Sequence, residues 1–290
     1  MPVLYSYTAM IPSLPPSTGP IGVFDSGYGG LTILDKIRGL MPEYDYIYLG
    51  DSARCPYGPR SFEVVYDFTL KAVSKLFELG CPLVILACNT ASAKALRTIQ
   101  QINLPVIDAT RRVLGVIRPT AECIGEITRS RHVGILATAG TIKSESYLLE
   151  IHKLSPDIVV TGEACPMWVS LVENNEYQSE GADYFVKQHI NRLLDKDPMI
   201  DTIILGCTHY PLLLDKIRQF TPGHIRIIAQ GEYVARSLQD YLNRHPEMDA
   251  RCEKGGKCRF LTTESENKFE ESASIFLGRQ DIKVESIALE

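Results

Sequence analysis

Two segments of the chain end in the same chemical pattern. Residues 82–93 read PLVILACNTASA and residues 201–212 read DTIILGCTHYPL, so that each apolar run ends in a small residue, a cysteine and polar side chains. A cysteine at the end of a buried strand, where a helix begins, lies among backbone N–H groups that favour its thiolate. Cys88 and Cys207 are therefore predicted to be two acid–base groups that face one substrate.

Two other chemistries are compatible with Cys207 and His209, which lie two residues apart. A zinc site needs three or four ligands, and no partner cluster is visible in the sequence. A Cys–His nucleophilic pair needs only one cysteine and leaves the matching unit around Cys88 unexplained. The paired-thiol interpretation accounts for both segments.

The other six cysteines are scattered without regular spacing. A disulfide framework is typical of small secreted chains, so we expect reduced thiols in a chain of 290 residues. A buried cysteine usually acts as a small core hydrophobe. We give this structural interpretation to Cys55, Cys81, Cys123, Cys165, Cys252 and Cys258.

The composition is that of an ordinary globular protein. Hydrophobic residues make up 45% of the chain, charged residues 22%, and the net charge is −5. A chain of this composition and length suits two α/β lobes or one large domain. The sequence shows no stripe of basic residues, so we expect no nucleic-acid partner. No apolar run approaches the roughly 18 residues of a membrane span, and residues 1–20 contain no Lys or Arg, unlike a signal peptide. We expect a cytoplasmic protein whose first twenty residues form an extension.

Strand-like runs alternate with helix-patterned segments, which predicts an α/β fold of two lobes, each with a mostly parallel sheet flanked by helices. One expected helix covers residues 61–79, where apolar side chains recur at helical spacing. Another covers residues 91–101. The expected strands are 21–25, 46–50, 83–88, 104–108, 132–138, 157–161, 202–207, 225–228 and 259–263.

Ligands of parallel sheets gather at the carboxyl ends of the strands. The polar residues that follow the expected strands are therefore site candidates. They are Asp25, Ser26, Asp51, Asn89, Thr90, Thr138, Thr141, Thr208 and His209.

The glycine-rich turn at residues 26–30 could be mistaken for a phosphate-binding loop. It lacks the Gly-x-Gly-x-x-Gly order and the Gly-Lys-Ser/Thr ending, which disfavours nucleotide binding. Its glycines instead favour a turn that approaches a small ligand closely.

Five motifs together resemble glutamate racemase, in that family's order and across nearly all of residues 21–290. They are DSGYGGL at 25–31, GDSARCPYG at 50–58, ACNTASA at 87–93, ATAGTIKS at 137–144 and LGCTHYPLL at 205–213.

The resemblance implies a cofactor-independent enzyme that interconverts L- and D-glutamate and supplies D-glutamate for peptidoglycan. It implies an active site in the cleft between two lobes, the second inserted into the first. Lobe one would be residues 1–111 plus 229–290, and lobe two residues 112–228. Cys88 would handle the α-proton of the D-enantiomer and Cys207 that of the L-enantiomer.

By the same resemblance, Asp25 and Asp51 lie near the first cysteine, and Glu173 and His209 near the second. These groups would tune or orient the thiols, and no metal is implied. The residues expected to hold the substrate are Asp25, Ser26, Pro56, Tyr57, Gly58, Asn89, Thr90, Thr138, Thr141 and Thr208.

The resemblance also suggests partners and rivals. Homodimers are usual in the family. Some Gram-negative members are activated by a nucleotide-linked muramoyl-alanine precursor, and the N-terminal extension motivates the hypothesis that this chain is activated in the same way. An aspartate or hydantoin racemase would use the same thiol pair. A two-lobed dicarboxylate-binding protein would bind glutamate without exchanging its α-proton.

Overall fold

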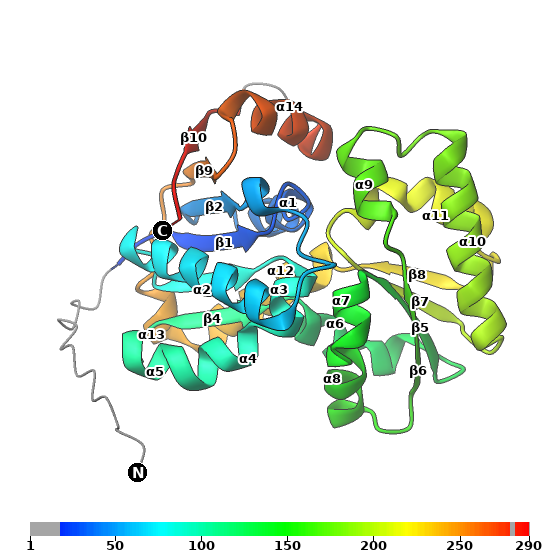
Figure 1. Ribbon diagram of the computed structural model, residues 1–290. Helices are drawn as coiled ribbons and strands as arrows, with labels where there is room; N and C mark the ends of the chain where they lie inside the picture. Colours follow the sequence, from blue (N-terminus) through cyan, green and yellow to red (C-terminus); the bar gives the residue numbers. More distant parts are fainter. Residues whose placement is uncertain (1–17, 279–281, 290) are drawn as a thin grey trace, which may run out of the picture.

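The computed structural model describes residues 18–278 and 282–289 and contains two sheets, joined by parallel pairings (Figure 1). The six-stranded sheet has the order β10-β9-β2-β1-β3-β4, and the four-stranded sheet has the order β6-β5-β7-β8. The strands are β1 Ile21–Asp25, β2 Tyr46–Gly50, β3 Leu83–Leu86, β4 Arg112–Gly115, β5 His132–Ala137, β6 Val159–Ala164, β7 Thr202–Gly206, β8 Arg226–Ala229, β9 Cys258–Thr262 and β10 Val284–Ser286.

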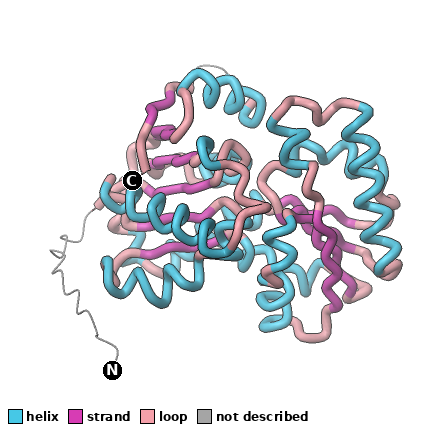
Figure 2. Tube along the Cα trace, viewed as in Figure 1, coloured by secondary structure: helices cyan, strands magenta, loops and turns pink. Residues whose placement is uncertain are grey.

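Helices flank both sheets (Figure 2), which confirms the predicted α/β class. Those around the larger sheet are α1 Leu31–Leu40, α2 Phe62–Glu78, α3 Asn89–Lys94, α4 Leu96–Thr98, α5 Leu104–Ile107, α12 Gly231–Arg244, α13 Pro246–Asp249 and α14 Glu266–Leu277. Those around the smaller sheet are α6 Ile117–Ile127, α7 Ala139–Lys143, α8 Ser146–Leu154, α9 Trp168–Glu173, α10 Glu180–Lys196 and α11 Leu214–Phe220.

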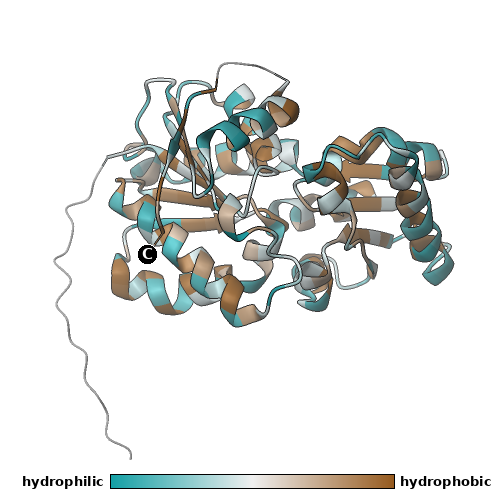
Figure 3. Ribbon diagram, turned by 45° about the horizontal axis from the view of Figure 1, so that its top comes forward, coloured by the Kyte–Doolittle hydropathy of each residue, from teal (hydrophilic) through white to brown (hydrophobic). Residues whose placement is uncertain are grey.

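The central strands are apolar because helices cover both faces of each sheet. In β1, Ile21 and Val23 pack in one core with α1 and α12, whereas Phe24 packs in a second core with α2. Figure 3 shows hydrophobic strands inside and hydrophilic helix faces outside. Burial of this kind fixes the strand positions, and with them the polar residues at the strand ends.

One predicted strand is wrong. Residues 104–107 of the predicted strand 104–108 form helix α5, and the next strand is β4, Arg112–Gly115, which pairs with β3. The short run LPVI carries no periodicity that separates strand from helix, and Pro105 lies in the first turn of α5, where proline is well tolerated. The predicted helix 91–101 is broken into α3, α4 and a π-helical turn, Ile99–Asn103.

The chain passes between the sheets twice. It leaves the larger sheet after β4, just before Val116, and returns after β8, at Gln230. The predicted lobe boundaries, 111/112 and 228/229, remain a prediction. Strand β4, which follows the first boundary, pairs within the larger sheet, and β8, which contains the second, pairs within the smaller sheet.

Two further predictions concern the N-terminal extension and membrane-spanning helices. Of the expected N-terminal extension, residues 1–17 lie outside the described residues. In the part of the chain that is described, no helix combines the length and apolar character needed to cross a membrane.

Candidate active site

A small cavity lies where the strand ends of the two sheets meet. Its volume is about 20 Å³, enough for about one water molecule, so the site is closed in this structure. Its lining combines residues from both sheets: Ser26, Cys55, Pro56, Tyr57, Gly58, Cys88, Asn89, Thr90, Thr138, Val169, Cys207, Thr208 and His209.

Cys88 follows β3 and caps the N-terminus of α3. Its Sγ accepts a hydrogen bond from the backbone N–H of Ala91 and donates one to Oγ of Ser26, both at 3.4 Å. Burial and the nearby carboxylate of Asp25 raise the pKa of Cys88 to about 12. In the closed site, Cys88 is therefore a protonated thiol at neutral pH.

Cys207 follows β7 and lies beside a buried imidazole. Its Sγ is 3.9 Å from Nδ1 of His209, whose Nε2 is 3.1 Å from Oε1 of Glu173. Burial alone would lower the pKa of His209, but its hydrogen bonds to Cys207 and Glu173 outweigh burial and raise that pKa to about 10. His209 is thus an imidazolium at neutral pH, and a thiolate formed at Cys207 has it as an ion-pair partner.

Glu173 is shared between two donors. Its Oε1 accepts from His209 and, at 3.1 Å, from the thiol of Cys55. Burial works to raise the pKa of Glu173, but the hydrogen bond from His209 helps to lower it below the usual value. Glu173 therefore remains a carboxylate that holds the charge on His209.

Asp25 lies behind the cavity at the end of β1 and is fully buried. Its Oδ2 accepts from the backbone N–H of Gly27 at 2.9 Å, and its Oδ1 accepts from the hydroxyl of Thr208 at 3.4 Å. Burial raises the pKa of Asp25, although His209 opposes this. Asp25 thus links the turn after β1 to the loop that carries Cys207.

Asp51, at the end of β2, holds the loop that carries Tyr57. Its carboxylate accepts from the Tyr57 hydroxyl, from Nε of Arg54 at 2.8 Å and from the Thr263 hydroxyl at 2.9 Å. These hydrogen bonds hold the loop in which Tyr57 and Gly58 line the cavity.

Three threonine hydroxyls meet beside the cavity. Oγ1 of Thr138 is 3.0 Å from Oγ1 of Thr90 and 3.1 Å from Oγ1 of Thr141. Beside them, the backbone N–H of Gly140 donates to the carbonyl of Gly58 at 3.0 Å. Loops that follow strands of different sheets are thereby joined across the site.

The structure brings the predicted site residues into one cluster. Eleven of the fifteen line the cavity, whereas Asp25, Asp51, Glu173 and Thr141 lie behind it and bond to residues of the lining or its loops. The roles predicted for all of them stay predictions. Among the described residues, no group of three or more His, Cys, Asp or Glu side chains is placed to hold a metal ion.

Two lining residues were not among the predicted site residues. The core interpretation of Cys55 is wrong, because this residue is only partly buried and lines the cavity. Its place inside the motif at residues 50–58 does predict an extra thiol near the pocket. Val169 reaches the cavity from α9, and no local sequence signal marks it.

Comparisons with known proteins place the chain in a family. The model of the Asp/Glu/hydantoin racemase family matches residues 32–238. A glutamate racemase from Ruegeria sp. is 38% identical over 270 residues, which is 90% of this chain and 97% of the relative. The chain belongs to the glutamate racemase family. It is accordingly an isomerase of the racemase type.

Solved glutamate racemases share the fold. RacE1 of Bacillus anthracis has a TM-score of 0.85 at 36% identity, over 93% of this chain and 98% of its own. The Francisella tularensis enzyme, in complex with D-glutamate, has a TM-score of 0.82 at 31% identity, over 94% and 98%. The Escherichia coli enzyme, in complex with L-glutamate and the activator UDP-MurNAc-ala, has a TM-score of 0.73 at 27% identity, over 93% and 99%.

The raised pKa of His209 makes a testable contribution to stability. Because it is about 10 in the folded protein and about 6.5 in an unfolded chain, protonation stabilises the fold fully below about pH 6.5, and this contribution is lost as pH rises through about 10. Glu173→Gln should lower this pKa. Urea titration should then show a loss of unfolding free energy that is larger near pH 6 than near pH 10, by on the order of 1 kcal/mol.

The matched control is Glu176→Gln, an exposed carboxylate three residues further along the chain, beyond the end of α9. An equal loss at both pH values for Glu173→Gln would contradict an imidazolium held by Glu173.

Gly29 lets the turn after β1 approach the loop of Cys207. A Cβ built on Gly29 would lie 2.5 Å from Nδ1 of His209 and against the hydroxyl of Thr208. We expect Gly29→Ala to displace His209 and to lower racemase kcat/KM about tenfold or more, since a displacement of about 1 Å at an active site can cost on the order of 10²-fold in rate. Gly39→Ala is the control, because its Cβ would meet no atom within 4 Å. Unchanged kinetics in Gly29→Ala would argue against this constraint.

Proposed function

We propose that this chain racemises glutamate by a two-thiol mechanism and supplies D-glutamate for peptidoglycan in the cytoplasm. The observation that carries the proposal is that Cys88 and Cys207, which follow strands of different sheets, line the same closed cavity. The relatives named glutamate racemases support the substrate, as do the solved relatives with D-glutamate and L-glutamate.

In the L-to-D direction, the thiolate of Cys207 removes the α-proton. The C–H bond breaks, an S–H bond forms, and the electron pair stays on the α-carbon, delocalised into the carboxylate. Cys88, a thiol in the closed site, then donates its proton to the opposite face. The imidazolium of His209 stabilises the starting thiolate, and the D-to-L direction reverses the steps.

Neutral donors on the cavity wall suit an anionic transition state, because preplaced dipoles need little rearrangement as charge develops. Ser26, Asn89, Thr90 and Thr208 would hold the amino and α-carboxylate groups. Tyr57 and Gly58, with Pro56 beside them, would hold the side-chain carboxylate.

Substrate entry requires opening, because a cavity of about 20 Å³ holds about one water and not an amino acid. We propose that the predicted lobes, residues 1–111 with 229–290 and residues 112–228, separate for this purpose. The hydrogen bond from Gly140 to Gly58 would break on opening. The enzyme would need no added cofactor and would form a homodimer, which light scattering can measure.

Deuterium incorporation at the α-carbon of L- and D-glutamate tests the proposal. Wild type, without cofactor and with a chelator, should exchange the α-proton and invert the centre. Cys88→Ser and Cys207→Ser should each lose about 10²–10⁴-fold in racemisation, the range expected when an acid–base group is removed.

Cys258→Ser, on β9 away from the cavity, is the matched control and should keep full activity. Absence of exchange with glutamate would direct the search to aspartate and hydantoins, whereas glutamate binding without exchange would identify a binding protein. Tolerance of Cys88→Ser would instead favour a thiol hydrolase.

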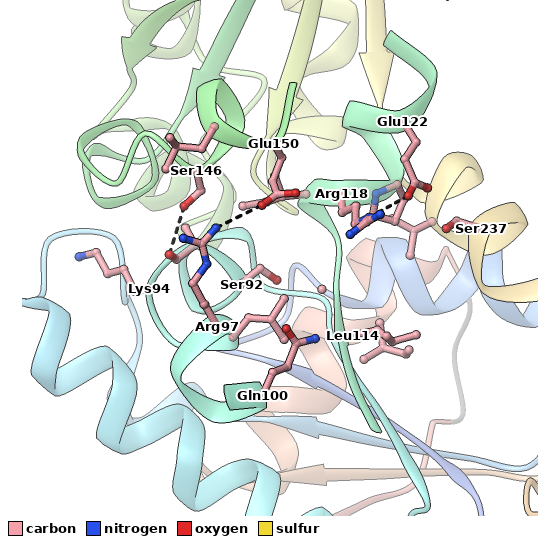
Figure 4. A pocket seen from close by; sticks show the side chains of 18 of the residues that line it. Ser92, Lys94, Arg97, Gln100, Leu114, Arg118, Glu122, Ser146, Glu150 and Ser237 are labelled. Atoms are coloured by element: carbon pink, nitrogen blue, oxygen red, sulfur yellow. Dashed lines mark hydrogen bonds and ion pairs between the residues drawn. The ribbon is translucent and has the colours of Figure 1, made fainter. Parts of the chain in front are cut away.

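A second part of the proposal is activation by a peptidoglycan precursor. The E. coli relative was solved with UDP-MurNAc-ala as activator. Here a cavity of about 720 Å³ lies beside α4, α6 and α8 (Figure 4), and five Lys or Arg but only two Glu line it. Arg97 pairs with Glu150, and Arg118 with Glu122, at its rim. An excess of cations suits a diphosphate-linked ligand.

The measurable quantity is the ratio of activated to basal racemase activity. Arg118→Ala should reduce the activation by UDP-MurNAc-Ala, because it removes a cation from the cavity wall. Arg259→Ala is the control, since Arg259 also forms an exposed ion pair, with Glu285, but lies on β9. Deletion of residues 1–18 tests the extension separately, and an unaltered response would exclude a role for it.

A further inference from the structure

The side chains of Asn89, Tyr147 and Gln230 form a closed ring of hydrogen bonds beside the candidate active site. Nδ2 of Asn89 donates to Oε1 of Gln230 at 2.8 Å, Nε2 of Gln230 donates to the Tyr147 hydroxyl at 2.6 Å, and that hydroxyl donates to Oδ1 of Asn89 at 2.7 Å. All three residues are at most 3% exposed. Water therefore does not compete for these bonds.

A backbone carbonyl fixes the direction of the ring. Nε2 of Gln230 also donates to the carbonyl of Val116 at 3.1 Å, and a carbonyl can only accept. The amide nitrogen of Gln230 must therefore face Val116, and its oxygen must face Asn89. Since that oxygen can only accept, Asn89 must present its own nitrogen to Gln230.

The ring determines which hydrogen-bonding groups of the Asn89 side chain are left for a ligand. Its Oδ1 is occupied by the Tyr147 hydroxyl, and one of its two N–H groups is used by Gln230. Its second N–H has no hydrogen-bond partner among the residues that the structure describes. Because Asn89 follows Cys88 directly and lines the cavity, this N–H is a donor suited to a carboxylate oxygen.

The ring also joins both passages of the chain between the sheets. Val116 follows β4, and Gln230 precedes α12. The two connecting segments between the sheets therefore meet at the side chain of Gln230. Tyr147 comes from α8, on the side of the smaller sheet. The orientation of Asn89 is therefore tied to the place where the two sheets are connected.

We propose that Gln230 and Tyr147 are positioning residues, which hold Asn89 as a hydrogen-bond donor to the carboxylate of the bound amino acid. This rests on the proposed function, because the substrate is taken to be glutamate. The ring supplies affinity through Asn89 and touches neither reacting thiol.

Tyr147→Phe and Gln230→Met test the proposal by steady-state kinetics in both directions. Each should raise KM about three- to tenfold for both enantiomers and leave kcat within about twofold. One poorly oriented hydrogen bond costs about 0.5–1.5 kcal/mol, and binding that is equal in ground and transition states appears in KM.

Tyr66→Phe is a matched control. The Tyr66 hydroxyl donates to Oδ1 of Asn103 at 2.8 Å, which is the same kind of bond, but neither residue lines the small cavity. Its kinetics should equal those of wild type even if its melting temperature falls.

A double-mutant cycle separates positioning from general destabilisation. If Tyr147 acts through Asn89, Tyr147→Phe should raise KM in the wild-type background and add no further rise in the Asn89→Ala background. An unchanged KM with a lowered melting temperature, or equal KM effects in both backgrounds, would overturn the proposal.

Turnover and glutamate binding by wild type are measured first, so that the two proposals can fail separately. If wild type binds glutamate by calorimetry but does not racemise it, the proposed function has failed, and the same variants test the ring through a three- to tenfold rise in Kd. If wild type neither binds nor racemises glutamate, both proposals are overturned.

Discussion

The buried imidazolium of His209 is the interaction on which the asymmetry of the site depends. Burial opposes its charge, and the charge persists because Glu173 and Cys207 contact the two ring nitrogens. On the other wall, Cys88 faces the carboxylate of Asp25 behind the cavity, and burial keeps it protonated. One thiol therefore lies beside a cation and the other near an anion. In the proposed two-thiol mechanism, this asymmetry suits proton removal at Cys207 and proton delivery at Cys88.

This arrangement depends on close approach of the two halves of the molecule. The turn after β1 can reach the loop of Cys207 only because Gly29 has no side chain, and Asp25 bonds across to Thr208. On the far side, Gly140 and Gly58 join their backbones directly. Glycines at these contacts allow backbone and catalytic groups to meet without intervening side chains. Shape and charge at the site are therefore set by the same few loops.

The sequence predicted those features that local patterns control. Buried parallel strands appear as apolar runs, so the positions of Asp25, Cys88 and Cys207 at strand ends could be predicted. Residues 104–107 could not, because a four-residue apolar run fits either a strand or a helical turn. The larger prediction, that two thiols share one cavity, came from the similarity of two distant segments and the family motifs.

Other parts of the site arise from contacts between residues distant in sequence. Gln230 meets Asn89 from 141 positions away, and the thiol of Cys55 reaches Glu173 across 118 positions. Neither contact has a periodic or spacing signal, because tertiary packing alone brings the partners together. Cys55 stands inside the motif at residues 50–58, so its nearness to the site could be predicted, whereas its bond to Glu173 could not.

The closed cavity has a consequence for how binding energy is used. Polar groups around the cavity bond to one another: Thr90 with Thr138, Cys88 with Ser26, and Gly140 with Gly58. A ligand must replace these neutral bonds, and an amino acid with two carboxylates offers charge-assisted bonds that are roughly twice as strong. A neutral ligand of the same size offers no such excess. Donors that bond to one another therefore favour a ligand with two carboxylates, and in the proposed mechanism they are oriented for the charge that develops when the α-proton leaves.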